Sequence, residues 1–292
     1  MPSSPWPADS GSFSHPAPFS PHDLLRGDVT LSSPPTLYHE LNRVLETPGG
    51  TAKDAAAVIE QDPALTARLL ALVNSSFFGL CRRVSTVAHA ITMVGLRELR
   101  HLVLATVVLE RFRGIGSDLE DMGSFWRQSL ACALLCRRLE DGTVAREETG
   151  LLFTVGLLHR IGDLIIFRRA PELARQALLR HRDYGLPLWE AERTVLGFDH
   201  GDVGAKLAEL WQFPPVMVEL LRFQQRPKLA PTHPRLCAIL YLAVNTAQEE
   251  MLPPASAPCW TIAGTTPETL GGLKTEILNQ AAEIAKIYGL PS

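Results

Sequence analysis

The sequence predicts an all-α protein made of two packed helical bundles. Apolar residues recur at intervals of three and four along most of the chain, as in Leu65, Leu69 and Leu72, which places them on one face of a helix. Helix starts are marked as well, because Asp62 can accept hydrogen bonds from free backbone N–H groups and Pro63 suits the first helical turn. No alternating apolar and polar pattern of a β-strand competes with these signals.

Composition indicates an ordinary globular protein, with 46% apolar and 20% charged residues among 292. The net charge of −3 argues against wholesale attraction to nucleic acid or membrane, and no apolar run reaches the roughly 18 residues that a membrane helix needs. Residues 1–21 are rich in Pro and Ser, and we expect a disordered lead-in without a secretory signal. We expect reduced, buried thiols in the cytoplasm at Cys81, Cys132, Cys136, Cys237 and Cys259.

Residues 22–115 are expected to form the first bundle. Apolar residues at helical spacing begin at Leu37 and end near Thr47–Gly50. Thr51 can cap a second helix, and a third follows Asp62–Pro63. These starts and stops predict short helices that are joined by polar or Gly-containing turns.

The end of this bundle, from Ser85 to Leu109, has the outline of a helix-turn-helix with Gly95 at the turn. In a DNA-binding interpretation, the candidate base and phosphate readers are Arg97, Arg100 and His101. The second helix, however, continues as an almost unbroken apolar run from Leu102 to Leu109. A helix that is apolar on all sides is buried, so we expect a core element instead.

Residues 116–250 are expected to form the second bundle. One long helix is predicted from Glu147 to about Arg169, and it places His159 inside an apolar run. A buried histidine needs hydrogen-bond partners or a metal for its ring nitrogens, so this position is a candidate site. Residues 251–292 then supply a Pro-rich spacer and a closing helix that begins at Thr266–Pro267.

Short motifs follow one another along about residues 31 to 250. They are Asp62–Leu65, Asn74–Ser75, Ala90–Ile91, Val94–Leu96, Phe125–Trp126, Gly156–His159, Ile161–Gly162, Glu192, Gly197, Asp199–His200, Val203–Gly204, Trp211 and Phe213–Pro214. In this order they resemble the HDOD family, the signalling branch of the HD superfamily whose catalytic members are metal-dependent phosphohydrolases. The resemblance implies an all-helical fold with an HD-like second bundle and a bacterial regulatory role.

The resemblance also implies where a catalytic HD protein would hold its one or two divalent cations. The corresponding positions here are Gln128, His159, Arg160, His200, Gln224, Gln225 and Asn245. Arg160 replaces the carboxylate of the His-Asp pair, and its positive charge would repel a divalent cation. Amide side chains can keep hydrogen bonds where metal ligands once stood. We therefore expect vestigial positions, with no bound metal, no cofactor and no catalytic residue.

Three hypotheses for the function follow. The favoured one is a non-catalytic signalling module that acts through protein partners, with room for a small ligand in the old pocket. The first alternative is a metal-dependent phosphohydrolase with a rearranged site. Its ligands would come from His159, His200, Asp163, Asp199 and Asp202. The second alternative is a DNA-binding regulator that uses the helix-turn-helix outline.

Overall fold

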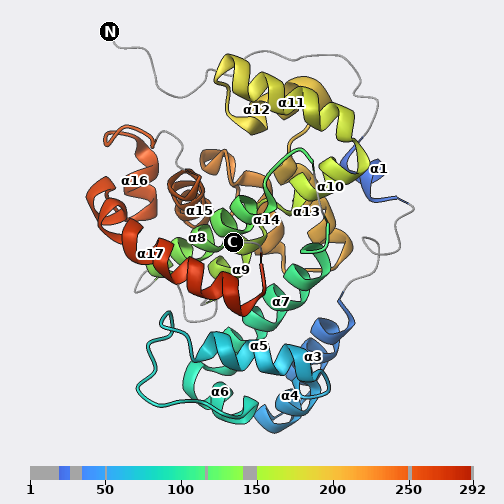
Figure 1. Cartoon of the computed structure of the whole chain (residues 1–292), viewed down its shortest axis with the longest axis vertical. Helices are drawn as coiled ribbons and strands as arrows, with labels where there is room; N and C mark the ends of the chain where they lie inside the picture. The colour runs from blue at the N-terminus through green and yellow to red at the C-terminus, as the bar shows by residue number, and fades with distance from the viewer. Residues whose placement is uncertain are drawn as a thin grey trace. The chain divides into compact units, whose positions relative to one another are not determined.

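The computed structural model describes residues 20–26, 35–49, 51–115, 118–140, 150–248 and 252–290. These residues form helices joined by short connections, and no β-strand occurs among them (Figure 1). The predicted all-α fold class is confirmed. Of the predicted lead-in, only Ser20 and Pro21 belong to the described residues. None of the helices in the described ranges is long and apolar enough to span a bilayer.

The chain divides into two compact units that alternate along the sequence. Unit 1 contains residues 1–32, 117–120 and 159–272, and unit 2 contains residues 33–116, 121–158 and 273–292. Helices that are distant in sequence therefore share a unit. The linear boundaries at 22–115, 116–250 and 251–292 remain predictions.

Unit 2 begins with helices α3 (Thr36–Glu46), α4 (Ala52–Ile59), α5 (Pro63–Val73), α6 (Val87–Val94) and α7 (Leu96–Phe112). It continues with α8 (Met122–Glu140), α9 (Leu151–Leu158) and the later turns of α17 (Pro267–Ile287). As predicted, the Asp62 carboxylate caps α5 by accepting from the backbone N–H groups of Ala64 and Leu65 at 2.9 and 3.0 Å. In α7, Leu102, Leu109 and the buried His101 face the core, so His101 is not available to a DNA base.

Unit 1 contains α1 (Pro21–Leu25), α10 (Ile161–Arg169), α11 (Pro171–Tyr184), α12 (Leu188–Leu196) and α13 (His200–Leu210). It continues with α14 (Pro215–Phe223), the 3₁₀ turn η1 (Pro227–Leu229), α15 (Pro234–Ala247), α16 (Pro258–Ala263) and the first turns of α17. Helix α13 packs against α10 and α14, and α11 packs against α12. This arrangement surrounds the start of α13 with other helices.

The long helix predicted from Glu147 to Arg169 is wrong. Glu147 lies outside the described residues, and the rest forms two helices, α9 and α10, that are separated by a turn at His159 and Arg160. Two features explain the break. Arg160 leaves the helical conformation with φ −98° and ψ 11°, and the His159 carbonyl accepts from the Gln224 side chain at 2.9 Å instead of from a helical N–H. The Gln224 side chain lies 65 positions further along the chain, outside the local apolar pattern that predicted one continuous helix.

The expectation of five buried thiols is wrong for one residue. Cys81 is exposed, whereas Cys132, Cys136, Cys237 and Cys259 are buried, and all five are thiols outside disulfides. Cys81 follows α5 in a connection without helical structure, and such connections run over the protein surface. Burial raises the pKa of the Cys136 thiol and brings that of Cys237 to about 12, so both stay protonated near neutral pH.

Helices α10 and α13 approach each other backbone to backbone at a glycine. A Cβ atom on Gly162 would lie 1.9 Å from the His200 carbonyl oxygen, a distance that no side chain can tolerate. The same atom on Gly204, one turn further along α13, would meet Ile161 Cγ2 at an ordinary 3.4 Å. The close contact therefore sets the position of His200 relative to α10.

Replacing Gly162 by Ala should destabilise the protein by about 2–4 kcal/mol, because the backbones of α10 and α13 must move apart. The Gly204→Ala change is the matched control and should stay within about 1 kcal/mol of the wild type. Urea unfolding followed by circular dichroism measures both values. Equal stability of the two variants would contradict the close approach.

Candidate functional site

A cluster of buried charged groups lies where α10, α12 and α13 of unit 1 meet. Its members are Arg160, Asp163, Glu192 and His200, all buried, and the less buried Glu120. The backbone of His159 is part of the same turn, and its side chain is fully buried. Burying so many charges is costly unless each one is paired, so the pairing explains the arrangement.

Arg160 bridges two carboxylates with three short hydrogen bonds. Its Nε donates to Asp163 Oδ2 at 2.7 Å, and its Nη1 and Nη2 donate to the two Glu120 oxygens at 2.7 and 2.6 Å. This fork geometry is the strongest form of an arginine–carboxylate pair. The exposed fractions of the side chains are 5% for Arg160, 0% for Asp163 and 20% for Glu120. Water therefore screens these interactions only weakly.

His200 sits between the other two carboxylates of the cluster. Its Nδ1 lies 2.7 Å from Glu192 Oε2 and 3.4 Å from Asp163 Oδ1. The same Glu192 oxygen accepts from the His200 backbone N–H at 2.9 Å. Because His200 is the first residue of α13, that backbone N–H is free to take a side-chain partner. Glu192 on α12 therefore fixes both the ring and the backbone of His200.

The pKa values reflect this pairing. Burial alone would lower the pKa of His200, but Asp163 and Glu192 outweigh it and raise the pKa to about 10. Burial raises the pKa of Glu192 to about 7, although His200 partly opposes the shift. Burial opposes the shift of Asp163 too, yet His200 and Arg160 hold its pKa below the usual range. For Arg160, burial would lower the pKa, and the carboxylates of Asp163 and Glu120 raise it instead. The positive charges of Arg160 and His200 thus neutralise most of the negative charge of the three carboxylates.

Three of these residues could offer ligand atoms to a metal ion. Atoms of Asp163, Glu192 and His200 lie within 4.8 Å of one another. However, Asp163 Oδ2 accepts from Arg160, and Glu192 Oε2 accepts from a histidine whose raised pKa keeps it protonated near neutral pH. A metal requires an unprotonated imidazole nitrogen. In this arrangement, a divalent cation at the three residues would compete with the bond from Arg160 to Asp163 and with the contact between His200 and Glu192.

Asp199 and Asp202, which were candidate ligands in the phosphohydrolase hypothesis, have structural partners. They form a capping box at the start of α13, and Asp202 N donates to Asp199 Oδ1 at 3.0 Å. Arg193 on α12 pairs with both, from Nε to Asp199 at 2.7 Å and from Nη2 to Asp202 at 2.6 Å. Arg226 adds a longer contact to Asp199 at 3.5 Å. These carboxylates therefore hold α12 and α13 together.

The four amide positions lie in different elements of the chain. Gln224, which is fully buried, donates from Nε2 to the carbonyls of His159 and Leu221 at 2.9 and 3.0 Å. Gln225 is half-buried in the turn after α14. Asn245 donates to Tyr241 O within α15 at 2.7 Å. Gln128 is a half-buried residue of α8 and belongs to unit 2. Gln224 thus bonds to the turn that carries Arg160.

Sequence reasoning missed Glu120 and gave Glu192 no role. Glu120 belongs to an acidic stretch that is typical of a solvated connector, yet it binds an arginine 40 positions away. Glu192 lies in an amphipathic helix with other charged residues, and nothing local separates it from Glu190. One usable signal was the spacing of Arg160 and Asp163, because oppositely charged residues at i and i+3 can pair in a helical turn.

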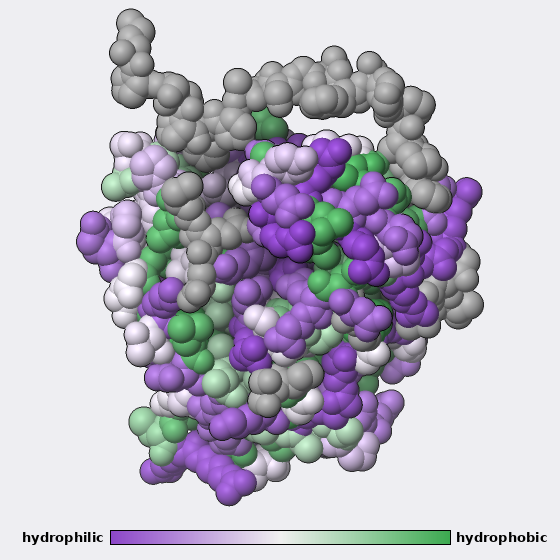
Figure 2. Space-filling view, turned by 45° about the horizontal axis from the view of Figure 1, so that its top comes forward, coloured by the Kyte–Doolittle hydropathy of each residue, from purple (hydrophilic) through white to green (hydrophobic). Residues whose placement is uncertain are grey.

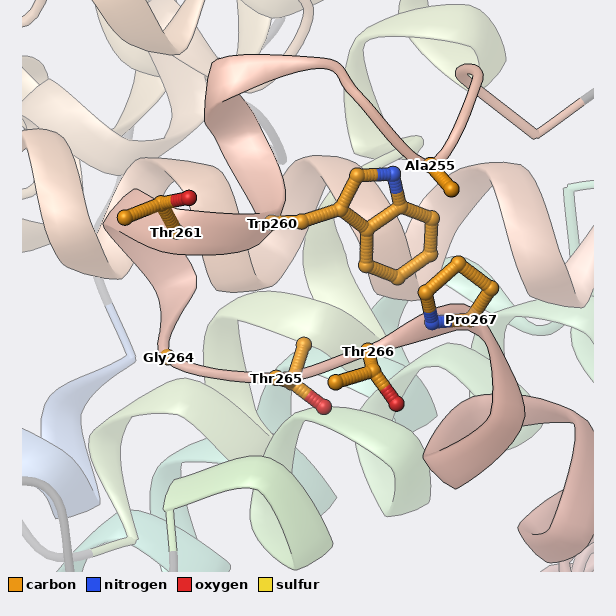
Figure 3. A pocket seen from close by; sticks show the side chains of 7 residues that line it. All are labelled: Ala255, Trp260, Thr261, Gly264, Thr265, Thr266 and Pro267. Carbon is orange, nitrogen blue, oxygen red and sulfur yellow. The ribbon is translucent and has the colours of Figure 1, made fainter.

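Unit 1 also has an open cavity of about 410 Å³ beside Trp260 (Figure 3). Its lining residues are Ala255, Trp260, Thr261, Gly264, Thr265, Thr266 and Pro267. Figure 3 shows the indole ring of Trp260 beside Ala255 and Pro267. The lining contains hydroxyl groups but no charged side chain, so it offers no acid, base or metal ligand for catalysis.

The chain is similar to known proteins. The HDOD domain model matches residues 31–227. An uncharacterized protein of Treponema pallidum (strain Nichols) is 27% identical over 197 residues, which cover 68% of this chain and 38% of that protein. This chain therefore spans well under half the length of that relative.

Solved structures of two other bacterial proteins have the same fold. A candidate phosphohydrolase from Shewanella amazonensis SB2B is 28% identical with a TM-score of 0.68, and the match covers 90% of this chain and 99% of the other. A candidate signal transduction protein from Marinobacter aquaeolei VT8 is 20% identical with a TM-score of 0.69. That match covers 88% of this chain and 59% of the other, and at this identity it shows the fold alone.

Removing the charge of Glu120 should destabilise the protein strongly. In Glu120→Gln, the buried guanidinium of Arg160 loses a two-point ionic partner, and we expect a loss of about 3 kcal/mol in the free energy of unfolding. The control Glu209→Gln removes a carboxylate that pairs with Arg222 and Lys206 at the surface and should cost about 1 kcal/mol or less. Chemical denaturation compares the two. If Glu120→Gln loses no more free energy of unfolding than Glu209→Gln, the salt bridge between Glu120 and Arg160 contributes little to stability.

Stability should also depend on pH through His200. Its pKa is about 10 in the fold against 6.5 for a free histidine, so its stabilisation is complete below pH 6.5 and is lost as pH rises towards 10. Between pH 7 and pH 10 we expect the free energy of unfolding to fall by up to about 1.4 kcal/mol per pH unit from this group. In His200→Gln this contribution should vanish. If the free energy of unfolding changes with pH in the same way in the wild type and in His200→Gln, His200 is not charged in the folded protein.

Proposed function

This chain belongs to the HDOD domain family, and we propose that it is a non-catalytic signal-transduction module that acts through protein contacts. In this proposal, Gln128, His159, Arg160, His200, Gln224, Gln225 and Asn245 are vestiges of a metal site. The site has become a charged core that stabilises the fold. The protein then regulates its partners through the surfaces by which it binds them.

One observation carries the proposal, the position of the Arg160 guanidinium. It binds Asp163 Oδ2 and both Glu120 oxygens with bonds of 2.6 to 2.7 Å, and so it places a positive charge beside Asp163, a carboxylate that could otherwise attract a divalent cation. A metal ion would have to displace this cation and a proton from His200 before it could bind. The cluster is also buried, so a phosphoester substrate would reach it only after the helices moved apart.

The outer face of α11 supports a role in protein contacts. Leu179 is 41% exposed and Tyr184 is 72% exposed, and the exposed arginines Arg175, Arg180 and Arg182 lie on the same helix. Figure 2 shows a largely hydrophilic surface that is interrupted by small hydrophobic patches. Aromatic and arginine side chains beside apolar ones are common in protein interfaces.

A small ligand in the old pocket fits the same proposal. His200 Nε2 and Gln224 Oε1 are buried, and among the described residues neither has a hydrogen-bond partner. Buried polar atoms of this kind are commonly satisfied by a water or a small polar molecule. Such a ligand would stabilise the cluster without any chemical step.

The runner-up is a metal-dependent phosphohydrolase with a rearranged site. It is favoured by the proximity of Asp163, Glu192 and His200 and by the likeness to the S. amazonensis protein. It requires that the salt bridge of Arg160 opens and that His200 loses its proton when metal binds. Hydrolysis of a phosphodiester by the wild-type protein in Mn²⁺ would establish it.

The change Arg160→Asp tests whether this arginine keeps metal out. Without the guanidinium, the carboxylates of Glu120, Asp163 and Glu192 repel one another and the variant should melt at a lower temperature than the wild type. Mn²⁺ should then restore stability, by about 2.7 kcal/mol at a concentration 100-fold above its dissociation constant. Thermal melts with and without Mn²⁺ measure the effect.

The control for this experiment is Arg222→Asp, which reverses a charge at the surface beside Glu209. Neither the control nor the wild type should respond to Mn²⁺. If the wild type gains as much stability from Mn²⁺ as Arg160→Asp does, Arg160 is no obstacle to metal and the non-catalytic proposal fails. An Arg160→Asp variant that folds but does not bind Mn²⁺ would show that other residues exclude the metal.

A further inference from the structure

Helix α11 presents one of its faces to solvent. On its other face, Ala174 and Ala177 are buried, and the helix packs against α10 and α12 of unit 1 (Figure 1). Leu179 belongs to the solvent face and is 41% exposed. A single exposed leucine is ordinary on a protein surface. The residues around this leucine, however, form a pattern.

Opposite charges stand at equal distances from Leu179 along the helix. Arg175 precedes it by four residues, and Asp183 follows it by four. Gln176 and Arg182 stand three residues before and after it. All four side chains are exposed, and residues three or four positions apart are neighbours on the surface of an α-helix. The solvent face of α11 therefore has a leucine at its centre, with a cation on one side and an anion on the other.

Such a face is complementary to itself. In an isologous contact between two copies, each residue that faces a second residue is faced by that residue in return. If two α11 helices lie antiparallel about a two-fold axis at Leu179, Arg175 of each copy faces Asp183 of the other. The leucines of the two copies then meet at the axis. Gln176 faces Arg182 of the second copy, and an amide oxygen can accept from a guanidinium group.

The partners of these charged groups within one chain leave them available to a second copy. Arg175 Nε lies 4.0 Å from Glu172 Oε2, and both side chains are largely exposed. Arg182 Nε donates to Asp183 Oδ1 at 2.8 Å, again between exposed side chains. Exposed ion pairs contribute little to stability, so these groups can change partners easily.

We propose that the solvent face of α11 is a self-association surface, through which two copies of this chain form an antiparallel dimer with Leu179 at the two-fold axis. Arginine is enriched in protein interfaces, and their centres are apolar. The helix has 14 residues and is about 21 Å long, which is short for an interface of the standard size of roughly 1,600 Å². We therefore expect a weak, concentration-dependent dimer. This inference goes beyond the proposed function and does not depend on whether the charged cluster binds metal.

The test is to reverse the two charges separately and together in the full-length protein. Sedimentation equilibrium at concentrations up to about 1 mM measures the dissociation constant of the dimer. Arg175→Asp alone, or Asp183→Arg alone, brings like charges together at both ends of the contact and should weaken the dimer at least about tenfold. The double change restores opposite charges and should restore the dissociation constant of the wild type.

A mixture of the two single variants is the sharpest form of this test. In an antiparallel pair, the carboxylates of the Arg175→Asp protein face the guanidinium groups of the Asp183→Arg protein at both ends. The mixture should therefore associate as tightly as the wild type, although each variant alone does not. The control Arg43→Asp reverses an exposed charge on α3 and should leave the dissociation constant unchanged.

Leu179→Ser provides a second variant without a change of charge, and it should weaken the dimer because the apolar centre is lost. Circular dichroism checks that each variant is folded, as expected for substitutions at exposed positions. A wild type that remains monomeric at every concentration would overturn the proposal. A dimer that both single charge changes leave intact would overturn it too, as would a loss that neither the double change nor the mixture repairs.

Discussion

The charged cluster depends on the salt bridges of Arg160. Its guanidinium group binds the carboxylates of Asp163 and Glu120. It places a permanent positive charge inside unit 1, beside a carboxylate with no exposed surface. It also binds Glu120, which belongs to the short segment 117–120 of unit 1, to the turn before α10. Without this cation, three carboxylates would have to share the single charge of His200.

His200 supplies the second positive charge of the cluster, because Asp163 and Glu192 raise its pKa to about 10. Asp163 touches both cations, at 2.7 Å from Arg160 and at 3.4 Å from His200, and therefore couples the two halves of the cluster. Glu192, with a pKa raised to about 7, can take up or release a proton near neutral pH to adjust the net charge. The glycine at position 162 makes this possible, since a larger residue would push α13 and His200 away from α10. Arg160 and His200 thus pair with the buried carboxylates, while His200 Nε2 keeps no hydrogen-bond partner among the described residues.

The sequence was sufficient for those parts of the fold that local chemistry determines. The capping carboxylate of Asp62 and the apolar run of α7 both have the roles that their patterns predicted. The break between α9 and α10 could not be predicted, because it depends on Gln224, which is 65 positions from the carbonyl it binds. Pairings over such separations leave no periodic signal in a single sequence. For the same reason Arg160 was identified as a repelling cation, but its partner Glu120 was not.

In the proposed function, the buried cations Arg160 and His200 take the place of metal ions. The most direct measurement is the metal content of untagged protein purified without chelators, determined by elemental analysis and paired with wild-type melting in Mn²⁺. We expect far less than one ion per chain and no change in melting temperature. One or two tightly held ions per chain would contradict it and would direct attention to phosphoester substrates.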